Sequence, residues 1–410
     1  MAHTADVAII GAGPYGLSCA AHFRTLGIDH VIFGSPMGAW RETMPRGMHL
    51  KSDGFASSLY HPEGKLTLRD YCAARNLPYA DLGVPVSLET FTAYGLEFQK
   101  QLVPHLDERM VARVGRTPTG FDLELSDGAR ISAKRVVIAA GVHSYAHIPV
   151  ELRHLPPDAL SHSKEHRDPS ALRGRKIAIL GRGASALDLA MLAHEAGADV
   201  QLISRNPHIE FHSPPRETRS LWTKLRYPTT GVGPGLWNYF YWRTPNLFRY
   251  LPPTVRVHHV RTALGPAPAW FVRKRIESQI PMHLGYHVAG ANYSGDKLTL
   301  ELAGVSGTRT LVVDHLVAAT GFVPEVARLP FFEANFASEI KTYEGSPILS
   351  RNFETSAAGL FFVGLPAAVS FGPVMRFAVG AQFTARRLSR ALADGRAKAT
   401  APVSPAFANA

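Results

Sequence analysis

The sequence predicts an α/β protein in which one strand–loop–helix unit occurs twice. Three observations support this prediction: a glycine-rich loop that recurs 170 residues later, two apolar strands that each end in small residues and glycine, and a globular composition. Of the 410 residues, 46% are hydrophobic and 19% are charged. A chain of this length and composition is sufficient for two or three domains with buried cores.

The first unit begins with an apolar strand from Val7 to Ile10, continues through a GxGxxG loop and leads into a helical pattern. In such a loop the first glycine permits a tight turn, and the second lets the backbone approach a pyrophosphate. The third position must be small so that helix and strand can pack. The pyrophosphate then lies at the helix N-terminus, where free N–H groups and the helix dipole favour negative charge. The residues expected at this first cofactor site are Gly11, Gly13, Pro14, Tyr15 and Gly16.

The second unit repeats this arrangement without a gap. Ile177 to Leu180 form its strand, and Gly197 stands 170 residues after Gly27, each where the glycine that ends a helix is expected. One GxGxxG loop is weak support for a nucleotide site. Two loops in register, each between a strand and a helix, favour paired nucleotide sites over incidental glycines. The residues expected at the second site are Gly181, Gly183, Ala184, Ser185 and Ala186.

Two further apolar strands, 135–141 and 315–321, flank the second loop and end in Gly141 and in Thr320-Gly321. Small residues there allow the chain to pass close to a bound cofactor. Their positions predict the crossings between two interleaved domains. The expected fold class is α/β, with two interleaved Rossmann-like three-layer dinucleotide-binding domains. The expected ranges are 1–165 and 315–410 for the two parts of the first domain, and 166–314 for the second, with an insertion at 206–285.

Charge and cysteine content exclude several other classes. The formal net charge is +11, but the basic residues are spread along the chain, which disfavours nucleic-acid binding and fits anionic cofactors. Cys19 and Cys72 form no CxxC pair, so neither a local dithiol nor a secreted disulfide scaffold is expected. No signal peptide precedes the first strand and no stretch reaches the ~18–20 apolar residues of a membrane span, so a cytoplasmic location is expected. No metal site is expected.

Together, the two glycine loops and the strand end 318–321 (AATG) resemble those of the two-dinucleotide-fold flavoproteins. That superfamily includes the pyridine nucleotide–disulfide reductases, thioredoxin reductases and class B flavin monooxygenases. The resemblance covers residues 5–205 and 280–390. It implies FAD in the first unit, NAD(P)H in the second, and a strand at 359–364 that returns to the first domain. A helix from Val374 to Leu392 is then expected to point its N-terminus at the flavin, where it would stabilise negative charge on the reduced ring. The expected FAD contacts in this return are Gly364, Pro373 and Met375.

The residues that end the second strand of each unit bear on cofactor choice. In the second unit they are Ser204-Arg205, and an arginine there suits the 2′-phosphate of NADPH, whereas an acidic residue would suit the ribose of NADH. The alternative is that Arg205 is a solvated charge at a strand end. In the first unit they are Gly34-Ser35, where the resemblance implies a carboxylate at position 34 to bind the adenosine ribose. FAD binding is therefore expected to use other groups, Ser35 among them.

The branch of the superfamily is inferred by exclusion and resemblance. The lack of a redox cysteine pair disfavours the disulfide reductases, which leaves oxygen or an external electron acceptor. His162 and its flanking serines resemble the "HS" element of class B monooxygenases, although an ordinary linker histidine would explain His162 as well. A Baeyer–Villiger enzyme is not supported, because Pro156, Asp158 and His166 stand where its fingerprint needs phenylalanine, glycine and tryptophan.

The segment 36–53 resembles the flavin-facing loop of these monooxygenases. Trp40, Arg41 and Met48 are expected to contact FAD, although plain core packing would explain Trp40 and Met48 as well. Together with the sequence at 371–377, this segment is similar to a bacterial group of FAD-dependent monooxygenases, some of which are labelled urate hydroxylase or amine N-hydroxylase. The candidate catalytic residues are Ser52 and Asp53 at the polar edge of the flavin and Arg376, which either stabilises charge near the flavin or forms a surface ion pair.

The insertion at 206–285 is rich in proline, arginine and aromatic residues, and it contains every tryptophan except Trp40. Such a segment could form a cap over a substrate pocket, a small helical core of its own, or a contact with a membrane surface.

The resemblance implies an NADPH-dependent FAD monooxygenase. NADPH would reduce FAD, oxygen would add at flavin C4a, and the peroxide would transfer one oxygen atom to a small organic substrate. One alternative is an NAD(P)H-dependent flavin reductase that passes electrons to an external acceptor. Another is a non-enzymatic flavoprotein that serves as a binding module. The expected partners are the small-molecule substrate and molecular oxygen, with no nucleic acid. Weak membrane-surface contact and oligomerisation are both compatible with the sequence.

Overall fold

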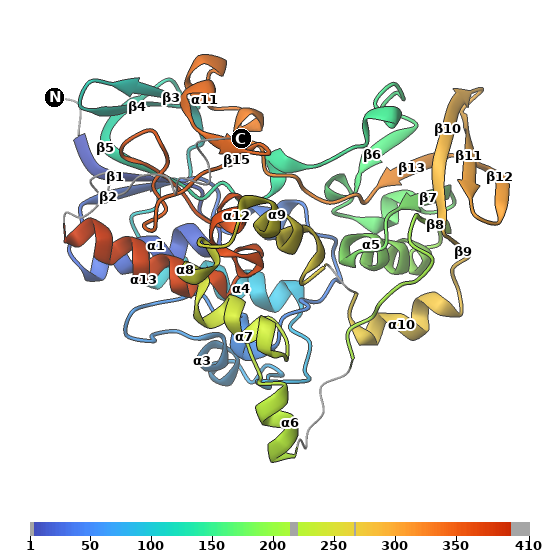
Figure 1. Ribbon diagram of the computed structural model, residues 1–410, viewed down its shortest axis with the longest axis horizontal. Coiled ribbons are helices and arrows are strands. Elements are labelled where there is room, and N and C mark those ends of the chain that lie inside the picture. The colour runs from blue at the N-terminus through green and yellow to red at the C-terminus, as the bar shows by residue number, and fades with distance from the viewer. Residues whose placement is uncertain (1–3, 214–219, 266–267, 395–410) are drawn as a thin grey trace.

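The structure, a computed structural model, describes residues 4–213, 220–265 and 268–394. Two α/β bodies lie side by side and are joined by chain crossings (Figure 1). Each body contains one of the two predicted strand–loop–helix units beside parallel strands, so the predicted fold class is confirmed.

The first body contains a six-stranded sheet in the order β2-β1-β5-β4-β3, with β16 also paired to β5. β2, β1, β5 and β16 run parallel, whereas β3, β4 and β5 form an antiparallel meander. The pairing of β16 with β5 confirms the predicted return of the chain to this domain. The strands are β1 (Thr4–Ile10), β2 (His30–Phe33), β3 (Val111–Thr117), β4 (Gly120–Leu125), β5 (Arg130–Ile138) and β16 (Leu360–Phe362). A two-stranded ribbon is formed by β14 (Thr342–Tyr343) and β15 (Ser346–Pro347).

Helix α1 of the first body begins at Pro14, whose missing N–H is tolerated at a first helical position, and ends before Gly27, which has φ +64°. Its residues 16–23 are buried, and it packs against α13, the last helix that the structure describes. The helices of this body are α1 (Pro14–Thr25), α2 (Gly38–Glu42), α3 (Leu68–Ala74), α4 (Leu88–Leu102), α11 (Ala334–Glu339), α12 (Ala368–Phe371) and α13 (Gly380–Ala393).

The predicted start of the last helix at Val374 is wrong. Pro373–Arg376 form a short 3-10 helix that follows Gly372, which has φ +92°. Phe377 is then extended, with φ −116° and ψ 153°, and this interrupts the helical hydrogen bonds. α13 therefore begins at Gly380.

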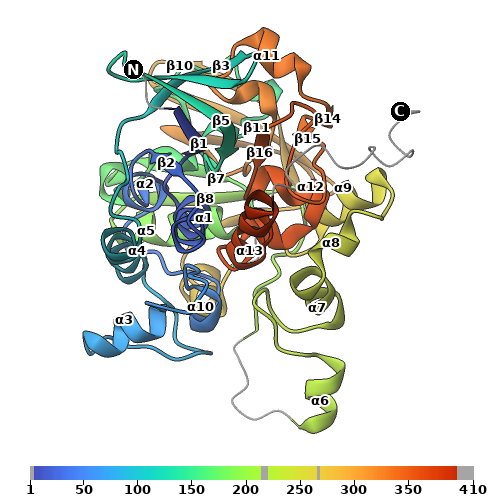
Figure 2. The same cartoon turned by 90° about the vertical axis from the view of Figure 1, so that its left-hand side faces the viewer.

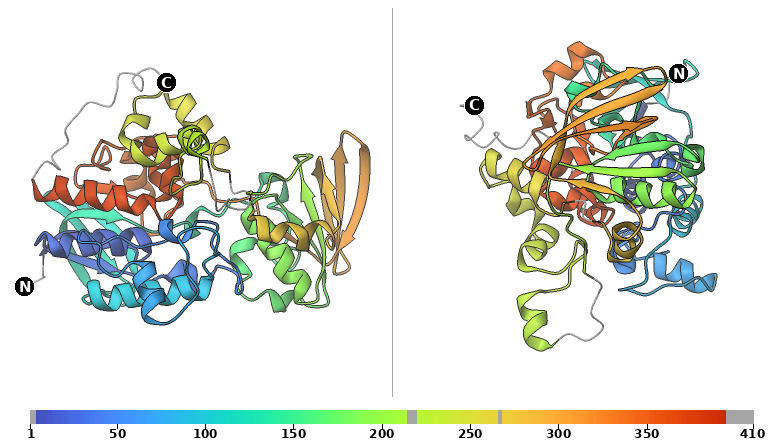
Figure 3. Two further views of the ribbon diagram at one scale, coloured as in Figure 1. Left: turned by 90° about the horizontal axis from the view of Figure 1, so that it is seen from below. Right: turned by 90° about the vertical axis from the view of Figure 1, so that its right-hand side faces the viewer.

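The second body is built on a five-stranded parallel sheet in the order β6-β13-β7-β8-β9. Because both faces of this sheet are covered, alternate residues of β7 enter different cores. Ile177 and Ile179 pack with α5 and α10, and Ala178 and Leu180 pack with a three-stranded antiparallel sheet. Figure 3 (right) shows that sheet, in orange, lying against the green parallel strands. The elements are β6 (Leu160–His162), β7 (Lys176–Leu180), α5 (Ala184–Glu195), β8 (Asp199–Ser204), α10 (Trp270–Glu277), β9 (Met282–Leu284), β10 (Tyr286–Ser294), β11 (Lys297–Gly304), β12 (Gly307–Val313) and β13 (His315–Ala318).

Two chain segments cross between the bodies and pair with each other. Val323 N–H donates to the Tyr145 carbonyl at 2.8 Å, and His147 N–H donates to the Gly321 carbonyl at 2.9 Å. The two crossings lie at the small-residue ends of the strands that were predicted at 135–141 and 315–321. Strands β6 and β13 lie just outside the range 166–314, so the sheet of the second body is wider than that range.

The predicted insertion is divided between the two bodies. Helices α6 (Leu221–Arg226), α7 (Leu236–Arg243), α8 (Pro245–Phe248) and α9 (Pro253–Thr262) follow one another along the first body, where α8 and α9 contact α12 (Figure 2). α10 packs on α5 in the second body, and β9 extends the parallel sheet. Residues 214–219 and 266–267 of the insertion lie outside the described residues. Within the described ranges, no helix combines the length and apolar character needed to cross a membrane.

Candidate functional site

The first glycine loop, between β1 and α1, is shaped by three glycines with different roles. Gly11 has φ +112°, and a Cβ there would lie 2.3 Å from the Ala139 carbonyl oxygen. A Cβ on Gly16 would lie 1.9 Å from the Gly11 carbonyl oxygen, so helix and strand pack too closely for any side chain. A Cβ on Gly13, in contrast, would meet nothing within 4 Å. The space beside Gly13 is open, as expected where a pyrophosphate approaches the backbone.

The second loop, between β7 and α5, has the same geometry. Gly181 has φ +148°, and its Cβ would lie 2.5 Å from the Ala319 carbonyl oxygen. Gly183 caps α5 with φ −82° and ψ 177°, compared with −83° and −172° for Gly13 at the start of α1. Both helices therefore present first-turn N–H groups that have no intrahelical acceptor. The predicted residues of these first turns are Pro14 and Tyr15 in α1 and Ala184, Ser185 and Ala186 in α5.

The two crossing strands also leave space at the predicted glycines. Gly141 has φ +70° and Gly321 has φ +85°, and a Cβ on either would meet nothing within 4 Å. Thr320 does not face this space with a free hydroxyl, because its Oγ1 donates to the His147 carbonyl. Backbone close to a ligand is thus available at both crossings.

Tyr15 connects the first loop to the returning chain. Its hydroxyl lies 3.0 Å from the Met375 carbonyl and 2.9 Å from the Phe377 carbonyl, and burial raises its pKa, so it remains a donor. Its ring lies 3.6 Å from where a Cβ of Gly364 would be. The hydroxyl would also lie 2.2 Å from a Cβ at Gly380, which requires glycine where α13 begins. Of the predicted return residues, Gly364 and Met375 therefore lie beside this loop.

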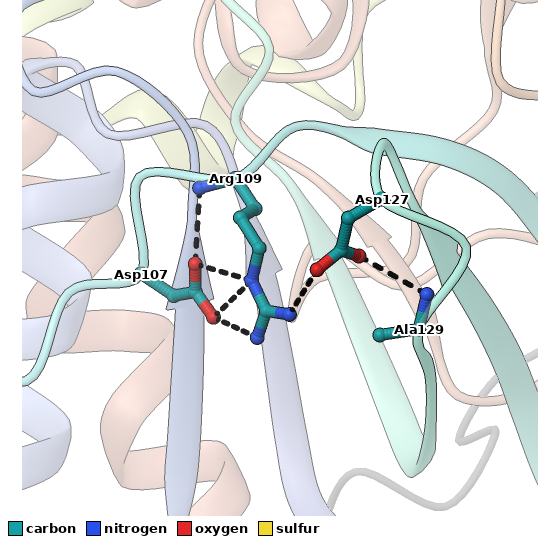
Figure 4. Close-up of polar contacts among 4 residues, drawn as sticks. All are labelled: Asp107, Arg109, Asp127 and Ala129. Atoms are coloured by element: carbon teal, nitrogen blue, oxygen red, sulfur yellow. Dashed lines mark hydrogen bonds and ion pairs between the residues drawn. The ribbon is translucent and has the colours of Figure 1, made fainter.

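Asp107 lies beside the end of β2, but its carboxylate does not replace the one that is missing at position 34. Gly34 N–H donates to the Asp107 carbonyl at 2.9 Å, so Asp107 lies beside the strand end. Its carboxylate, however, is held by Arg109, whose Nε lies 3.0 Å from both oxygens and whose Nη1 reaches Asp127 at 2.8 Å (Figure 4). The guanidinium lowers the pKa of Asp107, and this carboxylate is already occupied.

Glu42, at the end of α2, is a candidate that the sequence analysis missed. The Ser35 hydroxyl donates to Glu42 Oε1 at 3.0 Å, which holds an exposed carboxylate beside the end of β2. The signal was present in the sequence, because Glu42 is the first acidic residue after Gly34 and one short helix separates them. Ser35 thus acts through Glu42 in this structure.

At the end of β8, the Ser204 hydroxyl is hydrogen-bonded within the chain, whereas the Arg205 side chain is exposed. The Ser204 hydroxyl is engaged in a local turn, donating to the Asn206 carbonyl and accepting from the Asn206 N–H, both at 3.1 Å. Arg205 is exposed and forms no ion pair with any residue that the structure describes. Its guanidinium is therefore free to meet an anion at the carboxyl end of β8.

A cavity of about 570 Å³ lies where the 50–53 segment meets the insertion. This volume is within the usual range for small-molecule sites. Both Ser52 and Asp53 line it, so the structure brings these two predicted residues together. Phe377 of the return reaches it, whereas Arg376 does not line it. The remaining lining residues are Leu50, Lys51, Leu82, Gly83, Val84, Pro85, His212, Ser213, Thr223, Tyr227, Thr229, Thr230, Gly231, Val232, Gly233, Pro234, Leu264, Gly265, Ala269, Trp270 and Phe271.

Burial shifts the pKa of two titratable groups of this cavity in the direction that favours their uncharged forms. Burial raises the pKa of Asp53, although a hydrogen bond from the Gly83 backbone partly opposes the shift. Burial lowers the pKa of His212, and the Lys51 ammonium lowers it further. The shift makes the Asp53 carboxylate a stronger proton acceptor than an ordinary aspartate and keeps the His212 imidazole in its neutral form, which can accept a proton. His212 was missed by the sequence analysis because it belongs to no motif.

Lys51, which lines the cavity, forms an ion pair with a residue of the second body. Its Nζ lies 2.5 Å from Asp188 Oδ1, and only 16% and 5% of the two side chains are exposed. Asp188 belongs to α5, the helix that follows the second glycine loop. Lys51 also lies 5.4 Å from the centre of the Phe271 ring. Segment 36–53 of the first body and helix α5 of the second are therefore joined by a buried ion pair.

The other residues of segment 36–53 that were predicted to contact FAD lie against other parts of the protein. Trp40 meets Phe91 of α4 edge to face at 4.6 Å between ring centres, which is core packing. Arg41 donates to the Pro36 carbonyl at 3.4 Å. Met48 is half-buried and does not line the cavity.

Two predicted polar residues make backbone contacts between elements. Arg376 Nη1 donates to the Val260 carbonyl of α9 at 3.0 Å, and burial lowers the pKa of this guanidinium. The surface ion pair considered for Arg376 is wrong, because the side chain is largely buried and pairs with no acid that the structure describes. His162 Nε2 lies 3.1 Å from the Gly321 carbonyl, which places His162 against a crossing.

Cys19 and Cys72 are both buried and free. Burial raises the pKa of Cys19 to about 12 and also raises the pKa of Cys72. Neither thiol is therefore activated as a thiolate near pH 7, and dithiol chemistry through this pair is disfavoured.

Two equivalent glycine loops, each at the carboxyl end of a parallel sheet and linked by two crossings, define a protein of the two-dinucleotide-fold class. Residues 5–225 match the family model described as pyridine nucleotide-disulphide oxidoreductase. The chain belongs to this family, as the resemblance implied.

Two relatives of established function are similar to the chain. A ferredoxin–NADP reductase 2 of Chloroherpeton thalassium is 29% identical over 216 residues, which is 51% of this chain and 54% of the reductase. This match therefore spans about half the length of that relative. An FAD-dependent urate hydroxylase of Xanthomonas campestris pv. campestris is 24% identical and covers more, namely 96% of this chain and 86% of the hydroxylase.

A solved structure has the same fold over nearly the whole chain. The FAD-bound cadaverine monooxygenase of the desferrioxamine pathway of Erwinia amylovora superposes with a TM-score of 0.73. The superposition covers 97% of this chain and 96% of the monooxygenase, at 16% sequence identity. The similarity at this identity concerns the fold alone, and it extends to both bodies.

Proposed function

We propose that the protein is an NADPH-dependent FAD monooxygenase that transfers one oxygen atom to a small, largely apolar organic substrate. The cavity carries this proposal, because Asp53 of segment 50–53, His212 and other residues of the insertion all line it. Its wall is mostly apolar, which suits a substrate that must be held away from water. The full-length similarity to a urate hydroxylase supports the same reaction class.

In this proposal FAD binds in the first body and NADPH in the second. The open space at Gly13 and Gly141 accommodates the FAD pyrophosphate, and Glu42, held by Ser35, accepts a hydrogen bond from the adenosine ribose. Gly183 and Gly321 serve the NADPH pyrophosphate in the same way. The bound flavin supplies hydride acceptance and the activation of oxygen, which no side chain here can supply.

The protein's own residues would then control water and protons. Trp270, Phe271 and Phe377 line the cavity with apolar surface. Asp53, whose pKa is raised by burial, and His212, whose pKa is lowered by burial, accept or return a proton at the substrate. Ser52 offers a hydroxyl on the same wall. The insertion acts as a cap on the substrate side. The domain ranges 1–165, 166–314 and 315–410 stay a prediction.

Oxygen-18 labelling tests the activity. With NADPH, ¹⁸O₂ and a panel of amines and heterocycles, the FAD-loaded protein should form a product that carries one ¹⁸O atom, detected by mass spectrometry. A protein that oxidises NADPH only when an external electron acceptor is added, with no labelled product, would be a reductase instead.

The variant Asp53→Asn tests whether the Asp53 carboxylate takes part in the oxygenation. We expect it to lower labelled product by about 10²-fold or more, the usual scale for acid–base groups, without slowing the reduction of FAD by NADPH. Asp81→Asn is the matched control, because Asp81 is exposed, pairs with Arg69 and does not line the cavity. Equal losses in both variants would remove Asp53 from the proposed role.

Arg205→Asp is expected to reverse the cofactor preference. The variant loses the charge that would bind the 2′-phosphate and gains an acceptor for the ribose hydroxyl, so kcat/KM should fall for NADPH and rise for NADH. A change of about 10²-fold in the ratio is expected for one charged hydrogen-bonding partner. Arg173→Asp, at an exposed position before β7, is the control. An unchanged ratio for Arg205→Asp would show that Arg205 is only a solvated charge.

A further inference from the structure

The outer side of helices α6, α7 and α8 exposes large apolar side chains. The exposed fractions are 82% for Trp222, 64% for Trp237 and 80% for Tyr250. Single exposed apolar residues are ordinary on protein surfaces, but a contiguous group marks an interaction site. We call this group the aromatic patch. It consists of Trp222, Leu236, Trp237, Tyr239, Leu247 and Tyr250.

Contacts between the helices gather these residues. The end of α6 and the start of α7 share a shallow hollow that is lined by Arg226, Leu236 and Trp237. α7 contacts α8, and Tyr250, in the turn that follows α8, donates its N–H to the Leu247 carbonyl at 3.1 Å, which keeps these two residues close together. Figures 1 and 2 show the three helices following one another along one side of the first body.

Every charged side chain in residues 218–276, the segment that carries the patch, is basic. The sequence contains no aspartate or glutamate between Glu217 and Glu277. Arg226 stands four residues after Trp222 and Arg243 four residues after Tyr239, so each arginine shares a helix face with a patch residue. Both arginines are exposed, and neither pairs with an acid in the described part of the chain.

We propose that the aromatic patch binds the surface of an anionic phospholipid bilayer. Tryptophan and tyrosine rings are favoured at the level of the lipid headgroups, and arginines beside them attract anionic lipids. Because the patch is formed by short helices, none of which is long enough to span, it would lie in the interface rather than cross it. This inference does not depend on the proposed activity.

The observations favour a bilayer over a protein partner. Trp222 and Tyr250 project from the surface, at about four-fifths exposure, rather than lining a shaped pocket. Projecting rings can insert among headgroups without a matching surface, whereas a protein interface requires close shape complementarity. An acidic protein would pair with the arginines but would leave these rings without a specific partner.

Co-sedimentation of the full-length FAD-loaded protein with vesicles tests the proposal. We expect binding to phosphatidylcholine vesicles that contain phosphatidylglycerol, and much weaker binding to phosphatidylcholine alone. The double variant Arg226→Gln/Arg243→Gln should weaken partitioning by about 25-fold, since each charge near an anionic surface contributes about a fivefold factor. Trp222→Ala/Trp237→Ala should weaken binding to a similar degree and should reduce quenching of tryptophan fluorescence by brominated lipid.

A matched control removes two charges elsewhere. Lys100→Gln/Arg130→Gln changes exposed residues on α4 and β5 and should leave vesicle binding within about twofold of the parent, because these charges lie outside the patch. Equal losses in both double variants would mean that overall charge is responsible and would overturn the assignment. Failure to bind anionic vesicles, with retention on an acidic polypeptide instead, would overturn it as well. Circular dichroism of each variant confirms that the fold is intact.

Discussion

Replacing Gly13 by valine is expected to weaken FAD binding by at least about 10²-fold while leaving the flavin-free protein as stable as the parent. A pyrophosphate at the start of α1 would accept backbone N–H groups, and each hydrogen bond to a charged group contributes about 1.5–3 kcal/mol. A valine side chain occupies the space that the ligand needs. The position itself tolerates a side chain, because Gly13 has φ −83° and a Cβ there meets nothing within 4 Å. Flavin fluorescence titration and urea unfolding of the flavin-free protein measure the two effects separately.

Two other glycines serve as controls for Gly13→Val. Gly11→Val should destabilise the flavin-free protein by about 3 kcal/mol or more, since it combines φ +112° with a Cβ 2.3 Å from the Ala139 carbonyl. Gly183→Val should weaken NADPH binding and spare FAD, because the same geometry recurs in the second body. If Gly13→Val bound FAD normally, the first glycine loop would not be the FAD site.

Replacing Lys51 by methionine is expected to lower the free energy of unfolding by about 3–5 kcal/mol, the usual cost of leaving one member of a buried ion pair alone. Asp188 is 5% exposed, so without the ammonium its carboxylate would be buried without a counter-charge. The double variant Lys51→Met/Asp188→Leu should recover most of this loss, because two apolar side chains can replace the pair. Denaturant unfolding of the two variants and the parent measures the coupling directly. Lys65→Met, which removes an exposed lysine paired with Glu63, should stay within about 0.5 kcal/mol.

The pH dependence of Lys51→Met has a defined sign. Burial already raises the pKa of Asp188, and Lys51 opposes this rise. Without Lys51 the folded state should therefore hold a proton that the unfolded chain releases above its ordinary pKa of about 3.9. Stability of the variant is then greatest in acid and is lost as pH rises through the raised pKa of Asp188. A variant whose deficit, relative to the parent, is the same at pH 5 and pH 8 would contradict this account.

The glycine loops could be predicted from the sequence because their geometry is local. The turn at Gly11 and the close packing at Gly16 depend on residues within one strand–loop–helix unit, and the repeat 170 residues later gave an internal check. The return of the strand at 359–364 to the first domain was expected from the family resemblance, whereas its pairing with β5 is known only from the structure.

The cavity could not be predicted in the same way. Its wall combines the segment at Asp53 with His212, Trp270 and Phe377, which are far apart in the sequence and share no spacing rule. The start of α13 depended on a contact between Gly380 and Tyr15 that no local pattern encodes. Arg376 was misjudged for the same reason, because its acceptor is the carbonyl of Val260 in the insertion.

The pairing of β16 with β5 has a consequence for the order in which the protein is made. Residues 360–362 complete the parallel sheet of the first body, and α13 covers α1 only when residues 380–393 have been synthesised. The second body, from β6 to β13, emerges from the ribosome before either of them. Domains fold as units during synthesis, so the second body can fold while the first still lacks a strand and its covering helix. The amino-terminal part of the first body must therefore wait, with apolar surface exposed, until residues 360–393 have been made.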